Sequence, residues 1–423
     1  MTTTIRAVLR DRDAALYLTG VVVSGFGTSA LWLVSGVWVK DLTGSDGLAA
    51  LCMLAMWAPT LAGPLLGTLA DRFPRRPLLI ASSLFLAALL PVLLTVDSPG
   101  LTWLVLGVLL VYGATGVVND AAEAALVANT LPAALLGDFN GLRMAITEGM
   151  KLVSPLAGAG LYTLYGGPAV VLLDAATFVV AAGVYAGLRT GGDAEDTRNA
   201  SRSLPEQAQR VERPRRRQRP LPRLRRLLAP TSVGARHLWA HPRLRPLVLA
   251  GGFSMLCAGL NGALFYAVID GLGRSPSYAG VLYAVQGAGS VSVGLLSGRA
   301  LRWLGERRFA AWGIAVTAVA VALRAVPSDG VALLSSAAIG AGLPCVLIAA
   351  LTAVQRETPD AVLGRTVATA NTLVYSPNVI GLGVGAGLVE LVDYRPALVV
   401  LGVTWLAVGS LLLRGGRGER AVR

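Results

Sequence analysis

Long apolar stretches separated by short polar gaps fill most of this chain. The stretches reach the ~20 residues that a helix needs to cross ~30 Å of hydrocarbon. The first six predicted spans are 14–39, 46–70, 77–96, 101–126, 139–163 and 168–188, and the second six are 246–269, 277–301, 307–326, 330–354, 364–389 and 394–414. Because backbone polar groups in lipid must be satisfied within each segment, these unbroken runs predict helices and not barrel strands. The pattern predicts an all-α membrane protein with twelve transmembrane helices.

The apolar pattern stops between the sixth and seventh spans, which divides the chain into two halves. We expect a six-helix half over 1–188, a linker over 189–245, a second six-helix half over 246–414 and a tail over 415–423. The linker is rich in Arg and Pro, so it cannot bury a core of its own.

Basic residues are unevenly distributed between alternate gaps. One set of gaps carries few of them in or beside it, namely Lys40, Arg274, Arg324 and Arg395. The other set holds many more, including the N-terminal segment, Arg72, Arg75, Arg76, the linker and the tail. Basic residues concentrate on the cytoplasmic side. Both termini and the linker are therefore predicted to be cytoplasmic.

Composition supports a membrane protein and argues against other classes. Hydrophobic residues make up 54% of the chain and charged residues 14%, well below the ~25% charged share of soluble domains. The formal charge of +13 lies mostly in the loops and tails, where it indicates topology and attraction to anionic lipid, with no nucleic-acid partner. The three cysteines lie in predicted spans without paired spacing, and His237 and His241 lack further ligands nearby, so we expect no disulfide, metal or cofactor.

The two halves resemble each other in sequence. The basic turn 67–76 after the second span matches 298–307 after the eighth, and 132–137 after the fourth span matches 359–364 after the tenth. The spans that follow these last two segments each carry a Ser-Pro pair. Internal repeats are typical of secondary transporters, whose substrate site lies between the halves near the bilayer midplane.

The segment Gly63-Pro-Leu-Leu-Gly67-Thr-Leu-Ala-Asp71-Arg-Phe-Pro-Arg75-Arg76 resembles the cytoplasmic loop signature of the major facilitator superfamily. The regions 140–160 and 173–178 resemble its drug-exporter branch, which includes macrolide and siderophore efflux proteins. Two departures stand out: Pro74 occupies a position where the family usually has glycine, and the Arg-x-x-Gln-Gly pattern of many proton antiporters is absent from 109–123.

The resemblance implies a cytoplasmic gate. Arg75 would pair with an acid at the inner end of the fourth span, for which Asp120 is the candidate, with Glu123 one turn further on. Asp71 would lie at the N-terminus of the eleventh span. The gate residues expected on this basis are Gly67, Asp71, Arg75, Arg76, Asp120 and Glu123. The alternative is that these charges are solvated at the membrane interface.

Several ionisable residues lie within predicted spans, where charge is costly. Glu148 and Lys151 lie ~14 to 18 Å into the fifth span at ~1.5 Å per residue, on one helix face. A buried lysine readily changes charge, so this pair is our candidate for proton coupling, with a purely structural pair as the alternative. Asp174 in the sixth span is a second titrating site or a structural acid. The acids Asp270, Glu390 and Asp393 lie at predicted outer helix ends, where hydration explains them.

Two further sets of residues complete the predicted site. Residues that bend the helices or allow close packing are Gly149, Ser154, Pro155, Gly158, Gly160, Ser376 and Pro377. Aromatic residues that line a cavity for a bulky substrate are Trp32, Trp57, Tyr112, Tyr283 and Tyr375, with Trp38 and Phe265 as further candidates. The alternative for these aromatic residues is that they face lipid.

We therefore expect a monomeric secondary transporter in the bacterial cytoplasmic membrane. It would export a hydrophobic or amphipathic small molecule, such as an antibiotic-like compound, a siderophore or a secondary metabolite, driven by protons flowing inward. A nutrient or metabolite importer on the same fold is the alternative. Paired arginines facing the cavity would favour it, yet arginine is missing from the middle of nearly every span. A signalling or scaffold role is a further alternative. No enzyme is expected, because the only histidines lie in a basic loop and no nucleophiles or metal ligands cluster.

Overall fold

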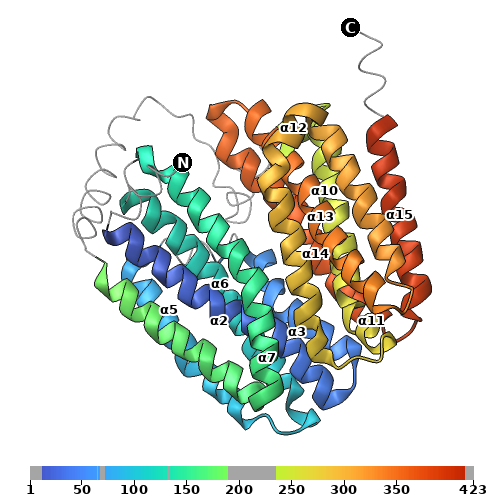
Figure 1. Cartoon of the computed structure of the whole chain (residues 1–423). Coiled ribbons are helices and arrows are strands. Elements are labelled where there is room, and N and C mark those ends of the chain that lie inside the picture. Colours follow the sequence, from blue (N-terminus) through green and yellow to red (C-terminus); the bar gives the residue numbers. More distant parts are fainter. Residues whose placement is uncertain (1–11, 64, 67–71, 131–132, 189–234, 415–423) are drawn as a thin grey trace, which may run out of the picture.

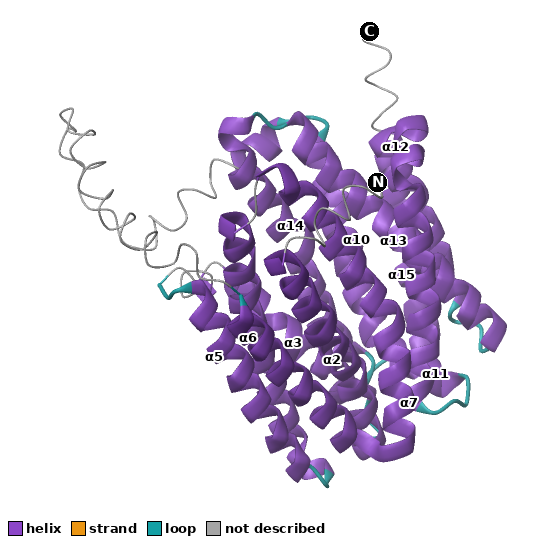
Figure 2. Ribbon diagram, turned by 60° about the vertical axis from the view of Figure 1, so that its left-hand side comes forward, coloured by secondary structure: helices purple, strands orange, loops and turns teal. Residues whose placement is uncertain are grey.

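The computed structural model describes residues 12–63, 65–66, 72–130, 133–188 and 235–414. Every regular element in these ranges is a helix (Figures 1 and 2). The predicted gate residues Gly67 and Asp71, most of the linker and the tail 415–423 lie outside the described residues.

The described residues of the N-terminal half form five α-helices and three 3-10 segments. They are α2 (Arg12–Thr43), α3 (Asp46–Trp57), η1 (Ala58–Ala62), α5 (Arg75–Leu89), η2 (Leu90–Thr95), η3 (Pro99–Leu101), α6 (Thr102–Thr130) and α7 (Ala133–Gly187). Local sequence explains several boundaries. The Ser45 side chain caps α3 by accepting a hydrogen bond from Leu48 N at 3.0 Å, and a proline stands at the start of η1, η2 and η3.

The C-terminal half contains six α-helices and one 3-10 turn. They are α10 (Leu244–Ala263), α11 (Phe265–Gly271), η4 (Pro276–Tyr278), α12 (Ala279–Leu323), α13 (Asp329–Glu357), α14 (Asp360–Leu388) and α15 (Tyr394–Arg414). Figure 1 shows that α2 begins and α15 ends at the same end of the bundle, which we call the termini end. We call the other end the opposite end.

Two glycines interrupt the longest helices. Gly166 in α7 has φ 75° and Gly305 in α12 has φ 72°, a backbone region that side chains with a Cβ rarely adopt. Gly166 lies between the predicted fifth and sixth spans, and Gly305 between the eighth and ninth. The helical path therefore breaks at two of the predicted gaps.

Eight helical stretches in the described residues are long and apolar enough to cross a membrane. Two of them, Leu152–Gly187 and Pro276–Leu323, run through the kink glycines and each covers parts of two predicted spans. The stretch Asp46–Ala62 is apolar but shorter. Length and composition thus identify eight candidate membrane-spanning stretches in the described residues, and the number of twelve transmembrane helices remains a prediction.

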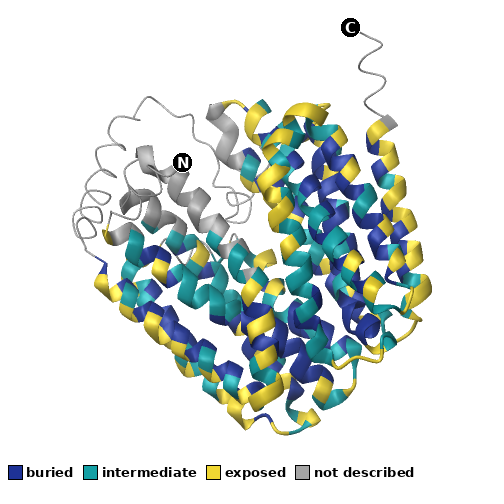
Figure 3. Ribbon diagram, in the orientation of Figure 1, coloured by how far each residue is buried: buried dark blue, intermediate teal, exposed yellow. Residues whose placement is uncertain are grey.

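Apolar side chains cover the outside of this bundle as well as its core. Trp303 is 90% exposed and Leu295 81% exposed, and many other large apolar residues lie on the surface. Figure 3 shows exposed positions along the outer sides of the helices and buried positions between them. Exposed apolar surface on this scale suits a bundle whose outer solvent is lipid.

Each half has apolar core of its own, and a further cluster joins the halves. This joining cluster includes Leu33 and Val37 of α2, Ala159 of α7, and Phe265 and Ile269 of α11. Its members lie toward the opposite end, next to the loops after α2 and α11. Close packing there depends on Gly280 of α12, because a Cβ at this position would lie 2.6 Å from the Ala159 Cβ. The halves are therefore packed tightly toward the opposite end.

Candidate functional site

A cavity of about 180 Å³, which we call the central cavity, lies between the two halves. Its lining residues come from α2 and α3 of the first half and from six helices or helix ends of the second. They are Trp32, Met53, Trp57, Ala258, Asn261, Gly262, Phe265, Tyr283, Gln286, Arg324, Ile339, Leu343, Asn378, Leu382 and Trp405. A cavity built by both halves is where an alternating-access transporter holds its substrate.

Larger hollows exist elsewhere but do not suit a site. Hollows of about 670 and 940 Å³ are lined almost wholly by apolar residues. Their lining includes Leu411 and Leu334, which are among the exposed large apolar residues. Lipid covers such surfaces, so volume alone does not select the site.

Aromatic rings from both halves meet in the central cavity. The Trp32 ring of α2 lies edge-on to Tyr283 of α12, with ring centroids 4.9 Å apart. Tyr283 also contacts Phe265, with centroids 4.5 Å apart. The structure thus places Trp32, Trp57 and Tyr283 in the lining.

Two aromatic residues from the predicted lining lie elsewhere. Tyr112 is buried inside the N-terminal half, where its ring packs edge-on against Phe178. Tyr375 of α14 is 41% exposed and is not among the lining residues. Hydropathy alone does not separate the faces of an apolar helix, so it could not assign these two rings.

Arg324 is the charged residue of the lining. Only 2% of it is exposed. Its Nη1 donates to Asn261 Oδ1 at 3.2 Å, its Nη2 donates to Ser336 Oγ at 2.8 Å, and its Cζ lies 5.3 Å from the centroid of the Phe265 ring. Within the described residues, no carboxylate pairs with it, and its Nε has no hydrogen-bond partner.

This placement corrects the sequence analysis, which counted Arg324 among the arginines in or beside the gaps. Arg324 follows α12 directly as its C-cap. Helical side chains lean toward the N-terminus of their helix, so a residue at this end reaches back into the bundle. A position beside a gap is therefore compatible with a buried guanidinium.

Asp174 occupies a separate buried site within the N-terminal half. It is 0% exposed. Its carboxylate accepts hydrogen bonds from Tyr112 Oη at 3.0 Å and Thr177 Oγ1 at 3.2 Å, and Tyr112 Oη also bonds Thr28 Oγ1 at 2.8 Å. No Lys, Arg or His of the described chain pairs with this carboxylate. Gly27 of α2 makes room for it, because a Cβ there would overlap Asp174 and Thr177.

The predicted pair of Glu148 and Lys151 lies on α7, but both side chains are outside the described residues. The neighbouring Leu152 lies against α12, since a Cβ at Gly287 would be 3.1 Å from the Leu152 Cα. This turn of α7 therefore packs against the other half.

Two of the predicted gate residues, Arg76 and Glu123, make contacts within the first half. Arg76 donates from Nε to Tyr185 O at 3.0 Å and from Nη2 to Ala186 O, which satisfies carbonyls at the end of α7. Glu123 accepts hydrogen bonds from Tyr17 Oη and Tyr185 Oη, both at 2.7 Å.

The remaining predicted gate pair is Arg75 and Asp120. Asp120 lies exposed on α6. The ion pairs of the described residues include none between Arg75 and Asp120.

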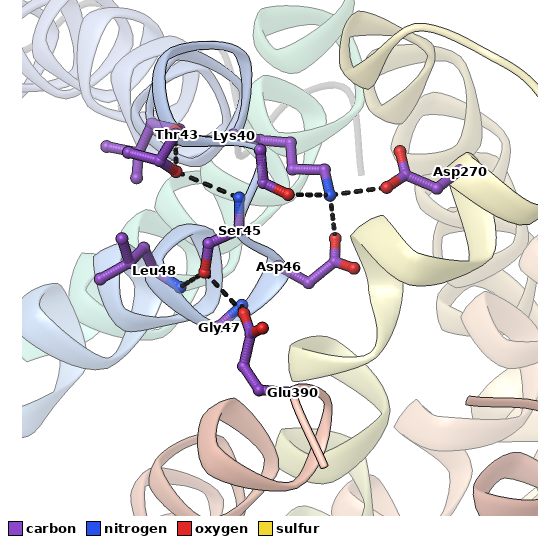
Figure 4. Close-up of polar contacts among 10 residues, drawn as sticks. Lys40, Thr43, Ser45, Asp46, Gly47, Leu48, Asp270 and Glu390 are labelled. Atoms are coloured by element: carbon purple, nitrogen blue, oxygen red, sulfur yellow. Dashed lines mark hydrogen bonds and ion pairs between the residues drawn. The ribbon is translucent and has the colours of Figure 1, made fainter. Parts of the chain in front are cut away.

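At the opposite end, a polar cluster that was not predicted joins the halves (Figure 4). The Lys40 Nζ lies 2.8 Å from Asp46 Oδ1 and 2.6 Å from Asp270 Oδ2 of α11. It also donates to Gly44 O at 2.9 Å. Lys40 is 7% exposed, and its two acids come from different halves.

Glu390, just after α14, forms the second part of this cluster. Its Oε1 accepts hydrogen bonds from Ser45 Oγ at 2.6 Å and Gly47 N at 2.8 Å (Figure 4). These two hydrogen bonds favour the charged carboxylate and lower the pKa of Glu390 below its usual value. We call Lys40, Ser45, Asp46, Gly47, Asp270 and Glu390 the clasp.

The clasp corrects the expectation that Asp270 and Glu390 are merely hydrated helix ends. Their partners lie more than two hundred residues away in the chain, in the other half. Gly47 also allows close approach, because a Cβ there would lie 2.7 Å from Ala386 O of α14.

Comparison with known proteins identifies the family. The sequence matches the profile of the Major Facilitator Superfamily over residues 17–382. The chain belongs to the major facilitator superfamily. A search of curated protein sequences gave no significant match.

Solved structures share the fold of this superfamily member. The nucleoside transporter NupG aligns with a TM-score of 0.69 at 13% identity, covering 96% of this chain and 99% of that one. A mutant form of the peptide transporter POT aligns with a TM-score of 0.69 at 14% identity, covering 95% of this chain and 94% of that one. A bacterial homologue of the iron transporter ferroportin, in an inward-facing state, aligns with a TM-score of 0.66 at 16% identity. The alignment covers 96% of this chain and 98% of that one.

The chain is thus a multi-pass membrane transport protein of this superfamily and not an enzyme. At these identities the solved structures show the fold alone, and they include transporters of several substrates.

Proposed function

We propose that this transporter exports a hydrophobic or amphipathic small molecule by proton-driven alternating access. The observation that carries the proposal is the central cavity, lined by Trp32 and Trp57 from one half and Phe265 and Tyr283 from the other. Such a lining suits the apolar surface of an antibiotic-like compound, a siderophore or a secondary metabolite.

Alternating access is supported by the contacts at the opposite end. There the clasp and the joining cluster hold the halves together. We assign this conformation to the state closed at the opposite end, and we assign an Arg75–Asp120 contact to the other state.

Coupling to protons is supported by acidic residues within the helices. Asp174 is buried with hydroxyl partners only, so binding a proton would remove an expensive buried charge. Glu148 and Lys151 remain the first candidates. A carboxylate and an ammonium on one helix face can pair, and a buried lysine readily changes its charge.

The proposed setting is a monomer in the bacterial cytoplasmic membrane with the termini end in the cytoplasm. The uneven distribution of arginine between the loops supports this orientation. The described conformation is then closed on the outer side, and an exporter takes up its substrate from the cytoplasmic side.

Efflux from cells that express the protein tests the proposal. Cells loaded with a panel of chemically distinct fluorescent antibiotics should retain less of at least one compound, and an uncoupler should restore retention. Trp57→Ala should reduce this efflux, because Trp57 lines the cavity. Trp103→Ala should leave it unchanged, because Trp103 is 70% exposed on the outside of the bundle. Equal retention with and without the protein across the panel contradicts the proposal.

An importer of an anionic nutrient or metabolite is a second candidate, favoured by one observation. Arg324 brings a positive charge to the central cavity. Uptake of such a compound by intact cells, faster with the protein than without it, would support import over export.

A further inference from the structure

The central cavity contains buried N–H donors that nothing satisfies. Arg324 and Trp32 both line it, and their buried Nε and Nε1 atoms have no hydrogen-bond partner among the described residues. By contrast, the indole of Trp405 in the same lining donates to Ser254 Oγ at 3.0 Å. Buried polar groups are nearly always paired, so two unpaired donors in one cavity call for an acceptor from outside the protein.

The lining is also unbalanced in charge. It contains one guanidinium and no Asp or Glu. A guanidinium keeps its charge at any physiological pH and offers five N–H donors, of which Asn261 and Ser336 each take one. A buried cation without an opposite charge is costly, and a bound anion removes that cost.

The rest of the lining suits an apolar body. Phe265, Tyr283 and Trp32 form a connected group of rings beside the guanidinium, which lies over the Phe265 ring. Apolar side chains such as Ile339 and Leu343 complete the lining. A ligand here has an acceptor-rich head among aromatic and aliphatic walls.

We propose that the substrate of this transporter is an amphipathic organic monoanion whose carboxylate, or comparable oxyanion, binds Arg324 and the Trp32 indole N–H. The aromatic or aliphatic part of that molecule packs on Phe265 and Tyr283. This inference rests on the proposed function, because it names the class of molecule that the central cavity carries.

Binding to the purified full-length protein tests the inference without any gradient. The probes are a series of arene carboxylates from phenylacetate through naphthylacetate to anthracene carboxylate, each paired with its neutral primary amide. The wild-type protein should bind at least one carboxylate about tenfold or more tightly than its amide, as expected for hydrogen bonds to a charged group. Isothermal titration gives both affinities.

Variants then separate the two donors. Arg324→Gln should abolish the preference for carboxylate over amide, and Trp32→Phe should reduce it severalfold while keeping a ring in place. Arg302→Gln, which removes an exposed arginine on the outside of α12, should leave it unchanged. Size-exclusion chromatography shows whether Arg324→Gln folds. If it does not, the inference is tested by the carboxylate preference of the wild-type protein and by the reduction of that preference in Trp32→Phe.

Equal binding of carboxylate and amide by the wild-type protein overturns the inference, and so does failure of every carboxylate to bind. A preference that survives in Arg324→Gln overturns it as well. Because binding needs no proton gradient or direction, a positive result stands even if efflux fails. Efflux of a cationic or neutral compound with no carboxylate binding supports export but refutes the anionic substrate.

Discussion

Ionisable side chains within the helices have distinct surroundings, and these surroundings set what each can do. Arg324 faces a cavity between the halves, whereas Asp174 is enclosed within one half by hydroxyl groups. A charge at the interface of the halves can respond to substrate. A charge within one half responds to substrate only through movement of that half.

Glu148 and Lys151 give the residue-scale prediction for coupling. Protonation of Glu148 would leave Lys151 charged and unpaired in a low dielectric, so the two groups should titrate together. Glu148→Gln should therefore abolish transport driven by a pH gradient while substrate exchange without a gradient continues. Transport into proteoliposomes measures both rates.

Asp97→Asn provides the matched control for Glu148→Gln, because it also removes one carboxylate from the first half, at an exposed position outside the helices. It should keep pH-driven transport. If Glu148→Gln retains full pH-driven transport, the pair is structural, and Asp174 becomes the coupling candidate.

At the scale of elements, the clasp couples α2 and α3 to α11 and α14. Lys40→Met should weaken closure at the opposite end, because it leaves Asp46 and Asp270 near each other without their shared cation. Since Asp270 is 46% exposed, we expect less than the ~3–5 kcal/mol of a fully buried pair. A shift of about tenfold, ~1.4 kcal/mol, toward the state open at this end is the expected outcome.

The distance between spin labels at Asp97→Cys and Leu391→Cys measures that shift, because these exposed positions lie at the opposite end in different halves. The native cysteines are buried and would be replaced by serine. Arg274→Gln is the control, because its partner Asp329 lies in the same half. A distance distribution unaltered by Lys40→Met would show that the clasp does not hold the halves.

Glu390 adds a pH dependence to the same closure. Its pKa is lowered in the clasp from the model-compound value of 4.5 by the hydrogen bonds from Ser45 and Gly47. A lowered carboxylate pKa stabilises the closed end at pH above 4.5, and this contribution is lost as pH falls through the lower, clasped value. The same spin-label distance should lengthen upon acidification.

Glu390→Gln separates this effect from those of the other two acids of the clasp, Asp46 and Asp270, which pair with Lys40. In Glu390→Gln the closed end should be weaker at neutral pH and should change less on acidification. An acid response identical to that of the wild-type protein would show that Glu390 does not cause it.

The elements and the individual side chains differ in how far sequence predicts them. Gaps in the apolar pattern anticipated the breaks at Gly166 and Gly305, because a helix leaves its path where glycine permits positive φ. Arg324 and the clasp were missed because their roles depend on side-chain direction and on partners from another half. Local hydropathy contains neither kind of information.

At the scale of the whole molecule, the orientation in the membrane follows from the arginine distribution and can be measured directly. With native cysteines replaced, Arg302→Cys at the termini end should react with an impermeant thiol reagent only from the cytoplasmic side. Leu391→Cys, 84% exposed at the opposite end, should react only from outside. The reverse pattern in intact cells would invert the orientation and the side on which the described conformation is closed.

In the proposed mechanism, two halves that are packed around one central cavity and closed by the clasp at one end drive active transport. Active transport requires that substrate moves against its gradient. The most direct measurement is accumulation of an amphipathic fluorescent substrate, identified by the efflux panel, inside everted membrane vesicles with an acidic lumen. Export driven by protons predicts accumulation in the lumen, which an uncoupler collapses and Glu148→Gln prevents. Accumulation that ignores the pH gradient, or none beyond that of vesicles lacking the protein, would contradict the account.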